Sequence, residues 1–307
     1  MSNLKILSGN HSHIGWDNSL KPVLTVVPGE EVVIEALEAS GGQITADSGV
    51  EAVEKLDFSK VNPITGPVYV EGAEPGDALV VDLLGFEGSG WGWTAIIPGF
   101  GLLAEEFDRP ALQIAKYDEK VVEFAPGIEL PTRPFPGTIG VALAEPGTHS
   151  VVNPRETGGN MDTRNLGPGS RLYLPVQVEG ALFSIGDTHA AQGDGEVCGT
   201  AVETGMKVHV KFDLIKKANL PRPQLEYEVV EPGEVGKYYT TTGIGPDLLE
   251  AAKNAVRDMV DYLVREYKLD AEFAYMLCSV AVDLKISEIV DVPHYLVSAH
   301  LPKSIFK

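Results

Sequence analysis

Cysteine is scarce in this chain, which has only Cys198 and Cys278 among its 307 residues. Two cysteines cannot build a disulfide scaffold, and such sparse use is typical of a reducing compartment. The segment from Met1 to Leu7 lacks the apolar core of a signal peptide. No apolar run approaches the roughly 20 residues that span a bilayer. We therefore expect a cytoplasmic protein without a membrane partner.

Positive charge is also in short supply. Lysine and arginine together number 24, against 44 aspartates and glutamates, and the formal net charge is -20. A surface with this charge repels phosphate backbones, so we expect no nucleic-acid partner. The surplus of carboxylates is compatible with a neutral or cationic small molecule and with a bound metal ion.

Long hydrophobic runs are missing, because 33 glycines and 21 prolines separate short segments rich in Val, Ile and Leu. Short apolar segments between turn residues are typical of β-strands. We expect strands at Val23–Val27, Glu31–Ala36, Gly66–Val70, Ala78–Phe86, Val121–Phe124, Gly137–Ala142, Arg171–Pro175, Ala181–Gly186, Val197–Thr204, Lys207–Leu214, Gln224–Val230 and Lys237–Thr242.

The pattern changes after residue 245. Apolar residues then recur at helical spacing to about Tyr267, with Asp247 in the position of an N-cap. A second helix is expected from Ala271 to Leu284, with Phe273, Met276 and Val280 among its core residues. No flexible linker is evident. We predict one compact unit over residues 1–307, β-rich in 1–245, with the helical segment 246–290 packed on it.

Two histidines near the beginning are the first candidate ligands. His11 and His13 flank one serine, and residues i and i+2 of an extended chain point to the same face. Both imidazoles could therefore reach one metal ion. The alternative is a pair of histidines that face solvent.

A second polar segment runs from Thr157 to Ser170. It places Asn160 and Asp162 after two glycines, and glycine allows a backbone to approach a ligand closely. Its amide and carboxylate groups indicate a functional loop. A long turn whose Asn and Asp side chains cap their own backbone remains the alternative.

The densest polar segment follows the apolar residues 181–185. Asp187 and His189 have the i, i+2 spacing that sets a carboxylate beside an imidazole, and Gln192, Asp194 and Glu196 follow. Asp187 and His189, with His13 or Asp162 as a third ligand, could bind a metal ion. One coordination position of that ion would then remain free for a water molecule. A Gly-Asp hairpin turn is the alternative, but a turn does not require His189 or Gln192.

Longer motifs in this chain resemble those of the acetamidase/formamidase family. The resemblance lies in residues 11–17 (HSHIGWD), 158–163 (GGNMDT), 182–196 (LFSIGDTHAAQGDGE), 199–203 (GTAVE) and 281–288 (AVDLKISE). It implies a mainly β fold with sandwich and barrel-like sheets, α+β overall, and a homodimer or larger homo-oligomer. It also implies hydrolysis of formamide, acetamide or similar short amides to carboxylate and ammonia, with a divalent metal, zinc being expected, held by His and Asp residues of these motifs.

The working hypothesis is attack on the amide by a metal-activated water. The predicted ligands are His11, His13, Asp162, Asp187 and His189, and the predicted substrate contacts are Trp93, Asn160 and Gln192. Glu105, which follows a Gly-rich stretch downstream of Trp91 and Trp93, or Glu196 would move the proton.

Two rival hypotheses remain open. One is a non-catalytic β-sandwich that holds a structural calcium ion through oxygen ligands. His13 and His189 speak against it, since calcium has little use for imidazole. The other is a thiol amidase that uses Cys198, although a buried structural thiol is the commoner outcome for a cysteine in such a segment. No Gly-x-Ser-x-Gly sequence is present to suggest a serine nucleophile.

Overall fold

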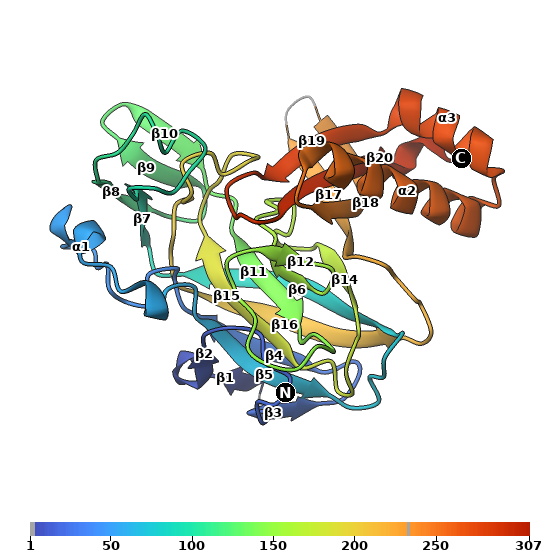
Figure 1. Cartoon of the computed structure of the whole chain (residues 1–307), viewed down its shortest axis with the longest axis horizontal. Coiled ribbons are helices and arrows are strands. Elements are labelled where there is room, and N and C mark those ends of the chain that lie inside the picture. Colours follow the sequence, from blue (N-terminus) through green and yellow to red (C-terminus); the bar gives the residue numbers. More distant parts are fainter. Residues whose placement is uncertain (1–3, 232–233) are drawn as a thin grey trace.

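Three β-sheets carry the fold in the computed structural model, which describes residues 4–231 and 234–307 (Figure 1). The largest has nine strands in the order β1-β4-β16-β6-β14-β17-β18-β20-β19. These strands are β1 (Lys5–Leu7), β4 (Glu31–Ala36), β16 (Met206–Ile215), β6 (Ala78–Gly88), β14 (Arg171–Pro175), β17 (Gln224–Glu231), β18 (Glu234–Gly245), β20 (Tyr295–Pro302) and β19 (Asp283–Glu288).

A seven-stranded sheet covers one part of the nine-stranded sheet. Its order is β12-β13-β11-β15-β5-β2, and β3 pairs with β5. The strands are β12 (Pro154–Arg155), β13 (Gly158–Asn160), β11 (Phe135–Val141), β15 (Phe183–His189), β5 (Ile64–Val70), β2 (Ser12–His13) and β3 (Leu24–Val26). Every residue of β11 and β15 is buried, which explains their glycine-rich, apolar sequences.

The main core lies between these two sheets. In β4, the buried Val32, Ile34 and Ala36 alternate with the less buried Glu31, Val33 and Glu35, so the strand turns one apolar face inward. Side chains of the second sheet join them in one buried cluster. The rings of Phe183 and Phe212 meet edge to face, 5.0 Å apart, across the two layers. Each sheet has two open ends, so no sheet of the described residues closes into a barrel.

A small sheet projects from the sandwich and approaches the end of β15. Its order is β10-β9-β8-β7, with β10 (Ile128–Pro131), β9 (Val121–Ala125), β8 (Ala111–Tyr117) and β7 (Trp91–Ile96). Glu203 forms isolated bridges to Trp93 of β7 and to His189 of β15. This residue therefore connects the small sheet to the sandwich.

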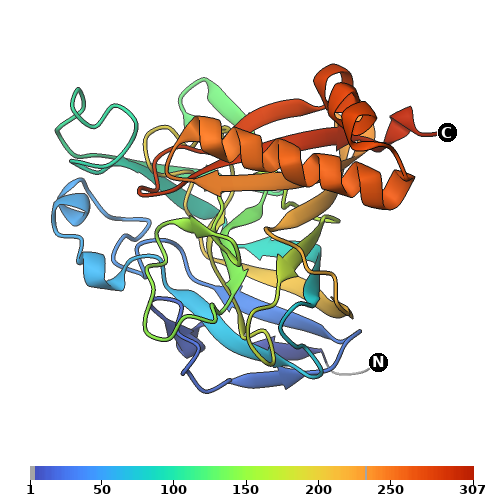
Figure 2. The same ribbon diagram turned by 45° about the vertical axis from the view of Figure 1, so that its right-hand side comes forward.

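The C-terminal helices cover the end of the nine-stranded sheet (Figure 2). Helix α2 (Leu248–Tyr267) begins as predicted, because the side chain of Asp247 accepts hydrogen bonds from the backbone N–H of Leu249 and Glu250. The helix lies against β18 and β20. Gly243 permits this contact, since a Cβ there would lie 1.8 Å from the carbonyl oxygen of Ala251.

The prediction for the second helix was partly wrong. Helix α3 (Ala271–Ala281) ends three residues early, because Asp283–Glu288 form strand β19 beside β20. Its expected core residues Phe273, Met276 and Val280 are 54%, 60% and 83% exposed. Only Ala274 and Cys278 are buried in this helix, because α3 lies on the outer side of α2 and β20 and meets them along one narrow face.

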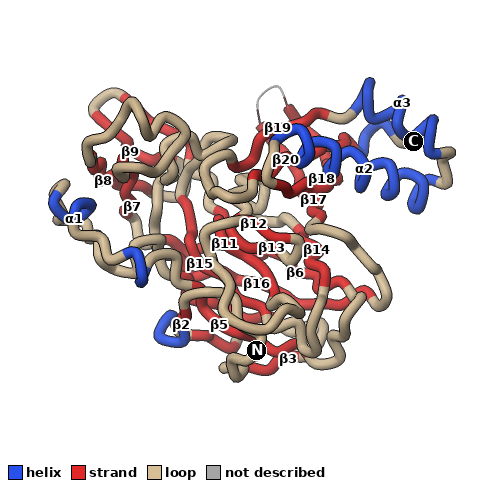
Figure 3. The backbone as a smooth tube through the Cα atoms, viewed as in Figure 1, coloured by secondary structure: helices blue, strands red, loops and turns tan. Residues whose placement is uncertain are grey.

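Most of the predicted strands overlap strands of the structure, but Val197–Thr204 does not. That segment is a loop with turns, in which Glu203 makes only isolated bridges. The predictions did not include strands β7, β8 and β20. They also missed short elements, including helix α1 (Glu51–Glu54) and the 3-10 turns Gly9–His11, Phe58–Lys60 and Lys303–Ile305 (Figure 3). Within the described parts of the chain, no helix combines the length and apolar character that a membrane crossing requires.

Candidate active site

The end of strand β15 places Asp187 and His189 at a junction of the sheets. His189 Nε2 lies 3.3 Å from Asp187 Oδ1 and 3.1 Å from Glu203 Oε2, and the imidazole is fully buried. The ring packs edge to face on Phe135, which is its partner on β11. Asp187, His189 and Glu203 thus offer ligand atoms that lie within 4.8 Å of one another.

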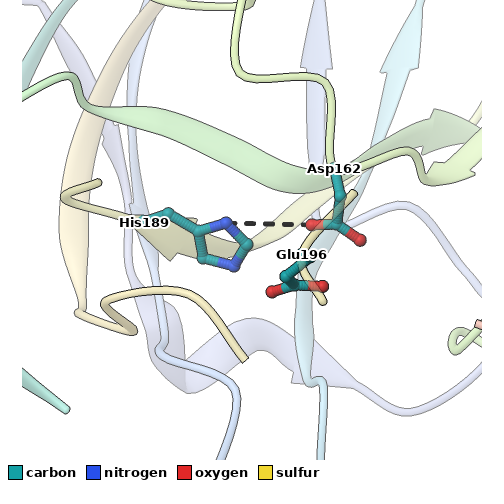
Figure 4. A group of neighbouring side chains, drawn as sticks. All are labelled: Asp162, His189 and Glu196. Carbon is teal, nitrogen blue, oxygen red and sulfur yellow. Dashed lines mark ion pairs between the residues drawn. The ribbon is translucent and has the colours of Figure 1, made fainter. Parts of the chain in front are cut away.

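A second set of ligand atoms shares the same imidazole. Asp162 follows β13, and its Oδ1 lies 3.7 Å from His189 Nδ1. Glu196, in the loop after β15, completes a group whose ligand atoms again lie within 4.8 Å of one another. Figure 4 shows the three side chains pointing towards one another from separate segments. The cluster therefore has one imidazole between two pairs of carboxyl groups.

Several of these residues have an unusual backbone conformation. Asp162, Asp187 and Glu196 have φ values of 42°, 53° and 47°. This left-handed region is sparsely populated by residues other than glycine, and each such residue costs on the order of 1–3 kcal/mol. Such strain concentrates at functional sites, where the surrounding structure maintains it.

Gly137 of β11 leaves room at the centre of the cluster. A Cβ at this position would lie 2.5 Å from Asp162 Oδ1, 2.7 Å from His189 Cε1 and 2.8 Å from Asp187 Oδ2. Three candidate ligands therefore converge where a side chain is missing. Any other residue at position 137 would force them apart.

The hydrogen bonds of Gln192 determine which nitrogen of His189 carries a proton. Gln192 Nε2 donates to the carbonyl oxygen of Asp162 at 2.9 Å, so its Oε1 faces His189 Nδ1, 2.8 Å away. Because Oε1 can only accept, Nδ1 must donate. In the neutral imidazole, Nε2 then carries the lone pair and points towards Asp187 and Glu203, as a metal-binding histidine requires.

Two further acidic residues lie behind the cluster. Asn160 Nδ2 donates to Asp291 Oδ2 at 2.6 Å, and the Thr138 hydroxyl lies between Asn160 and Asp187. Glu288 accepts hydrogen bonds from the backbone N–H groups of Val290 and Asp291. These contacts use both ends of the Asn160 amide, so Asn160 positions Asp291.

Burial dominates the electrostatics of the cluster. It raises the pKa of Asp162 to about 6 and the pKa of both Glu203 and Glu288 to about 8. It also raises the pKa of Glu196 and Asp291 well above the usual range. Burial alone would lower the pKa of His189, but the carboxyl groups of Glu203 and Asp187 raise it well above the ordinary value. The cluster is therefore deficient in positive charge.

Several carboxyl oxygens of the described cluster lack a well-formed hydrogen bond. Both oxygens of Asp162, Glu203 Oε2 and Glu288 Oε2 are buried and, among the described residues, receive no hydrogen bond of standard geometry, although His189 Nε2 lies 3.1 Å from Glu203 Oε2. Asp162 instead faces the carboxyl group of Asp291. Buried carboxylates are normally paired or bound to a metal. One imidazole with several carboxylates suits Zn²⁺ or a similar transition metal better than Ca²⁺, so the residues fit the expected ion.

Part of the cluster lines a cavity of about 360 Å³. Asn160, Asp187, Glu196, Glu203 and Asp291 line its polar end, and Trp93 lies among the apolar residues of its walls. A larger open groove of about 1170 Å³ lies elsewhere, between Tyr117 and Tyr227. None of the clustered carboxyl groups lines that groove, so the smaller cavity is the candidate active site.

The two histidines near the N-terminus do not join the cluster. His11 is exposed. His13 Nδ1 lies 2.9 Å from the carbonyl oxygen of Gly15, and His13 Nε2 lies 3.1 Å from the Ser184 hydroxyl. Both ring nitrogens have protein partners, through which His13 connects β2 to β15 outside the cluster.

Of the other candidate residues, Trp93 lines the cavity, whereas Glu105 and Cys198 do not. Trp93 lines the cavity, but its Nε1–H already donates to Glu38 at 2.7 Å. Glu105 is exposed in the loop after β7 and does not line the cavity, so it lacks the apolar surroundings expected for it. Cys198 lines a neighbouring cavity of about 410 Å³, which also borders Glu196, and its Sγ lies 3.3 Å from the Thr200 carbonyl oxygen.

Sequence reasoning missed three acidic residues of the site. Glu203 and Asp291 line the cavity, and Glu288 lies beside Asp291. Asp291 stands between Val290 and Val292 in the sequence, and Glu203 and Glu288 each adjoin one apolar residue. A carboxylate within an apolar segment is rarely buried without a partner, which was the available signal.

A family model, two curated proteins and a crystal structure all relate this chain to acetamidases and formamidases. The model of the Acetamidase/Formamidase family matches residues 5–149 and 143–307. The chain is 30% identical to the acetamidase of Mycolicibacterium smegmatis, covering 86% of this chain and 84% of that protein. It is 28% identical to the formamidase of Methylophilus methylotrophus, covering 96% and 89%. A crystal structure of an acetamidase from Bacillus halodurans superposes with a TM-score of 0.88 at 33% identity, covering 98% of each chain.

The sandwich, the acidic cavity and these relatives together define an amidohydrolase. More specifically, this chain belongs to the Acetamidase/Formamidase family.

Proposed function

We propose that this amidohydrolase cleaves primary amides, of which formamide and acetamide are the simplest, to carboxylate and ammonia in a metal-dependent reaction. The observation that carries the metal dependence is the buried cluster of one imidazole and several carboxyl groups, whose oxygens include four without a hydrogen bond of standard geometry among the described residues. The names of the acetamidase and formamidase relatives support the substrate class.

His189 Nε2 and the carboxyl groups of Asp187 and Glu203 would hold the ion, and Asp162 and Glu196 add further carboxyl groups beside the same imidazole. A divalent ion held there would polarise the amide carbonyl and acidify a water molecule. Two residues of the chain keep the ion site in a geometry that could bind a metal. Gln192 directs the lone pair of His189 Nε2 towards Asp187 and Glu203, and Gly137 keeps the space between the ligands open.

Glu196 is the proposed proton carrier. It lines the cavity, whereas Glu105 is exposed and does not. Burial raises its pKa well above the usual range, which suits a group that takes up a proton and then gives it to the departing amine. Asn160 and Gln192 have their amide groups engaged within the protein, so we assign them to positioning the site and not to binding substrate.

The test is removal of the metal from the purified protein by a chelator, with metal content measured by mass spectrometry and ammonia release measured for formamide and acetamide. We expect activity to disappear with the ion and to return when Zn²⁺ or Mn²⁺ is added. Full activity in the verified metal-free protein would overturn the metal dependence.

A matched pair of histidine variants completes the test. His189→Ala should abolish ammonia release and metal retention. His209→Ala removes a half-buried histidine of β16 that pairs with Glu31 away from the cavity, and it should preserve both.

A further inference from the structure

The cavity is much larger than the simplest amides require. Its volume of about 360 Å³ corresponds to about a dozen water molecules in the liquid. The acyl groups of formamide and acetamide contain only one and two carbons. Either of them would occupy the polar floor and leave the greater part of the cavity filled with water.

The unfilled part of the cavity has apolar walls. Leu56, Phe58 and Val61 line one side, from the segment that follows helix α1. The loop after β7 adds a second group of wall residues, which are Ile97, Pro98 and Phe100. Both segments lie on the side of the molecule that carries β7 (Figure 1). Apolar walls gain free energy when an apolar group displaces water from them.

Part of these walls is packed without a ligand, although Phe58 is 62% exposed. Trp93 and Ile97 are buried in a local hydrophobic cluster, and Leu56 and Phe100 pack against it. Phe100 is held by close contact with Gly199, where a Cβ would lie 2.4 Å from the Phe100 ring. A preformed apolar wall can discriminate between substrates because little ordering is needed on binding.

The charge of the lining restricts the acyl group further. The residues that line the cavity, all in the described part of the chain, include no lysine, arginine or histidine. They include four carboxyl groups, on Asp187, Glu196, Glu203 and Asp291. An acyl group that ends in a carboxylate would lose its hydration and meet no cationic side chain.

We propose that the cavity selects primary amides with an apolar, uncharged acyl group of about six to eight carbons, either aryl or alkyl. This rests on the proposed function, because it names the substrate class of the same site. Each methylene group buried against the walls should increase kcat/KM about fourfold, mainly through a lower KM.

The experiment measures ammonia release by the metal-loaded enzyme from formamide, acetamide, hexanamide and phenylacetamide. We expect kcat/KM to rise at least tenfold from acetamide to hexanamide or phenylacetamide. The monoamide of adipic acid, which matches hexanamide in chain length but ends in a carboxylate, should be at least tenfold poorer than hexanamide.

The possible failures are distinguishable. A kcat/KM that is highest for formamide or acetamide overturns the selection for large acyl groups and leaves the proposed function intact. Absence of ammonia release from every amide, in protein verified to hold metal, overturns the proposed function and this inference with it.

Two phenylalanines of one loop provide a matched pair of variants. Phe100→Ala should lower kcat/KM for hexanamide about tenfold and change that for acetamide less than twofold, because only the longer acyl group reaches this wall. Phe107→Ala removes a ring that is 52% exposed and does not line the cavity, and both values should stay within twofold. Equal losses for both amides in Phe100→Ala would contradict the assignment of the wall.

Discussion

Gln192 and His189 form a side-chain pair in which Gln192 Oε1 lies 2.8 Å from His189 Nδ1. The orientation of the amide is fixed independently, because its Nε2 donates to the carbonyl oxygen of Asp162. One glutamine therefore connects the two sets of ligands and sets the tautomer of the imidazole that they share.

Gln192→Leu should weaken metal binding and lower kcat/KM by about 10–100-fold, the range found when a partner of a metal ligand is removed. Competition with a chromogenic chelator measures the affinity independently of activity. Gln113→Leu removes an amide that bonds only to the backbone of β8 and β9, and it serves as the control. Unchanged affinity in Gln192→Leu would show that the pair does not orient the histidine.

Gly137→Ala places a methyl group between three proposed ligands, at distances that real Cβ atoms essentially never show. We expect loss of bound metal, a fall in activity of at least 100-fold, and destabilisation by about 1–3 kcal/mol from overpacking. Metal analysis and thermal unfolding check this. Gly85→Ala, on β6 with no atom within 4 Å of the added Cβ, should behave like the unaltered protein. Retained metal in Gly137→Ala would contradict the proposed centre.

Cys198→Ala separates the metal mechanism from a thiol mechanism. The Sγ of Cys198 lies near the Thr200 carbonyl oxygen, and Cys198 does not line the candidate active-site cavity. We expect kcat/KM to stay within about twofold, and iodoacetamide to leave the rate unchanged. A loss of more than 100-fold in a variant with normal metal content would restore the thiol as the nucleophile.

Asp77→Asn should destabilise the protein in a pH-dependent manner. Asp77 is buried and accepts hydrogen bonds from Lys216 Nζ and from the backbone N–H of Glu74 and Lys217. Burial alone would raise its pKa, but these donors hold the pKa below its ordinary value. Its stabilisation is therefore complete above the unfolded pKa of about 4 and is lost as the pH falls through the lower folded pKa.

Urea unfolding of the Asp77→Asn variant measures the effect. At pH 7 the free energy of unfolding should fall by about 1–3 kcal/mol, and the difference from the parent should shrink below about pH 4. Asp47→Asn, at an exposed position, is the control. A difference that stays constant from pH 7 to pH 3 would show that the charge of Asp77 does not contribute.

The parts of the site that the sequence predicted are the parts formed locally. Asp187 and His189 are two residues apart on one strand, and their side chains meet. Asp162 reaches them because β13 pairs with β11, which in turn pairs with β15. Glu203 could not be placed, because its position depends on bridges to both Trp93 and His189, which no sequence spacing records.

Identical spacing leads to different surroundings elsewhere in the chain. His11 and His13 have the same i, i+2 spacing as Asp187 and His189, but the structure places them outside the cluster, where His13 contacts Gly15 and Ser184. Helical periodicity located α3 but could not show that α2 and β20 cover only one narrow face of it. Periodicity identifies an apolar face, and only the tertiary packing decides whether that face is covered.

The floor and the walls of the cavity come from different segments of the chain. The polar floor comes from β13, the end of β15, the loop around Glu196 and Glu203, and Asp291, whereas Leu56, Phe58 and Phe100 stand on two surface segments. Substitutions or length changes in those two segments would alter the acyl group accepted while the reacting centre stays the same. A lineage of such enzymes could therefore diversify its substrates by loop replacement alone, and a protein engineer could follow the same route.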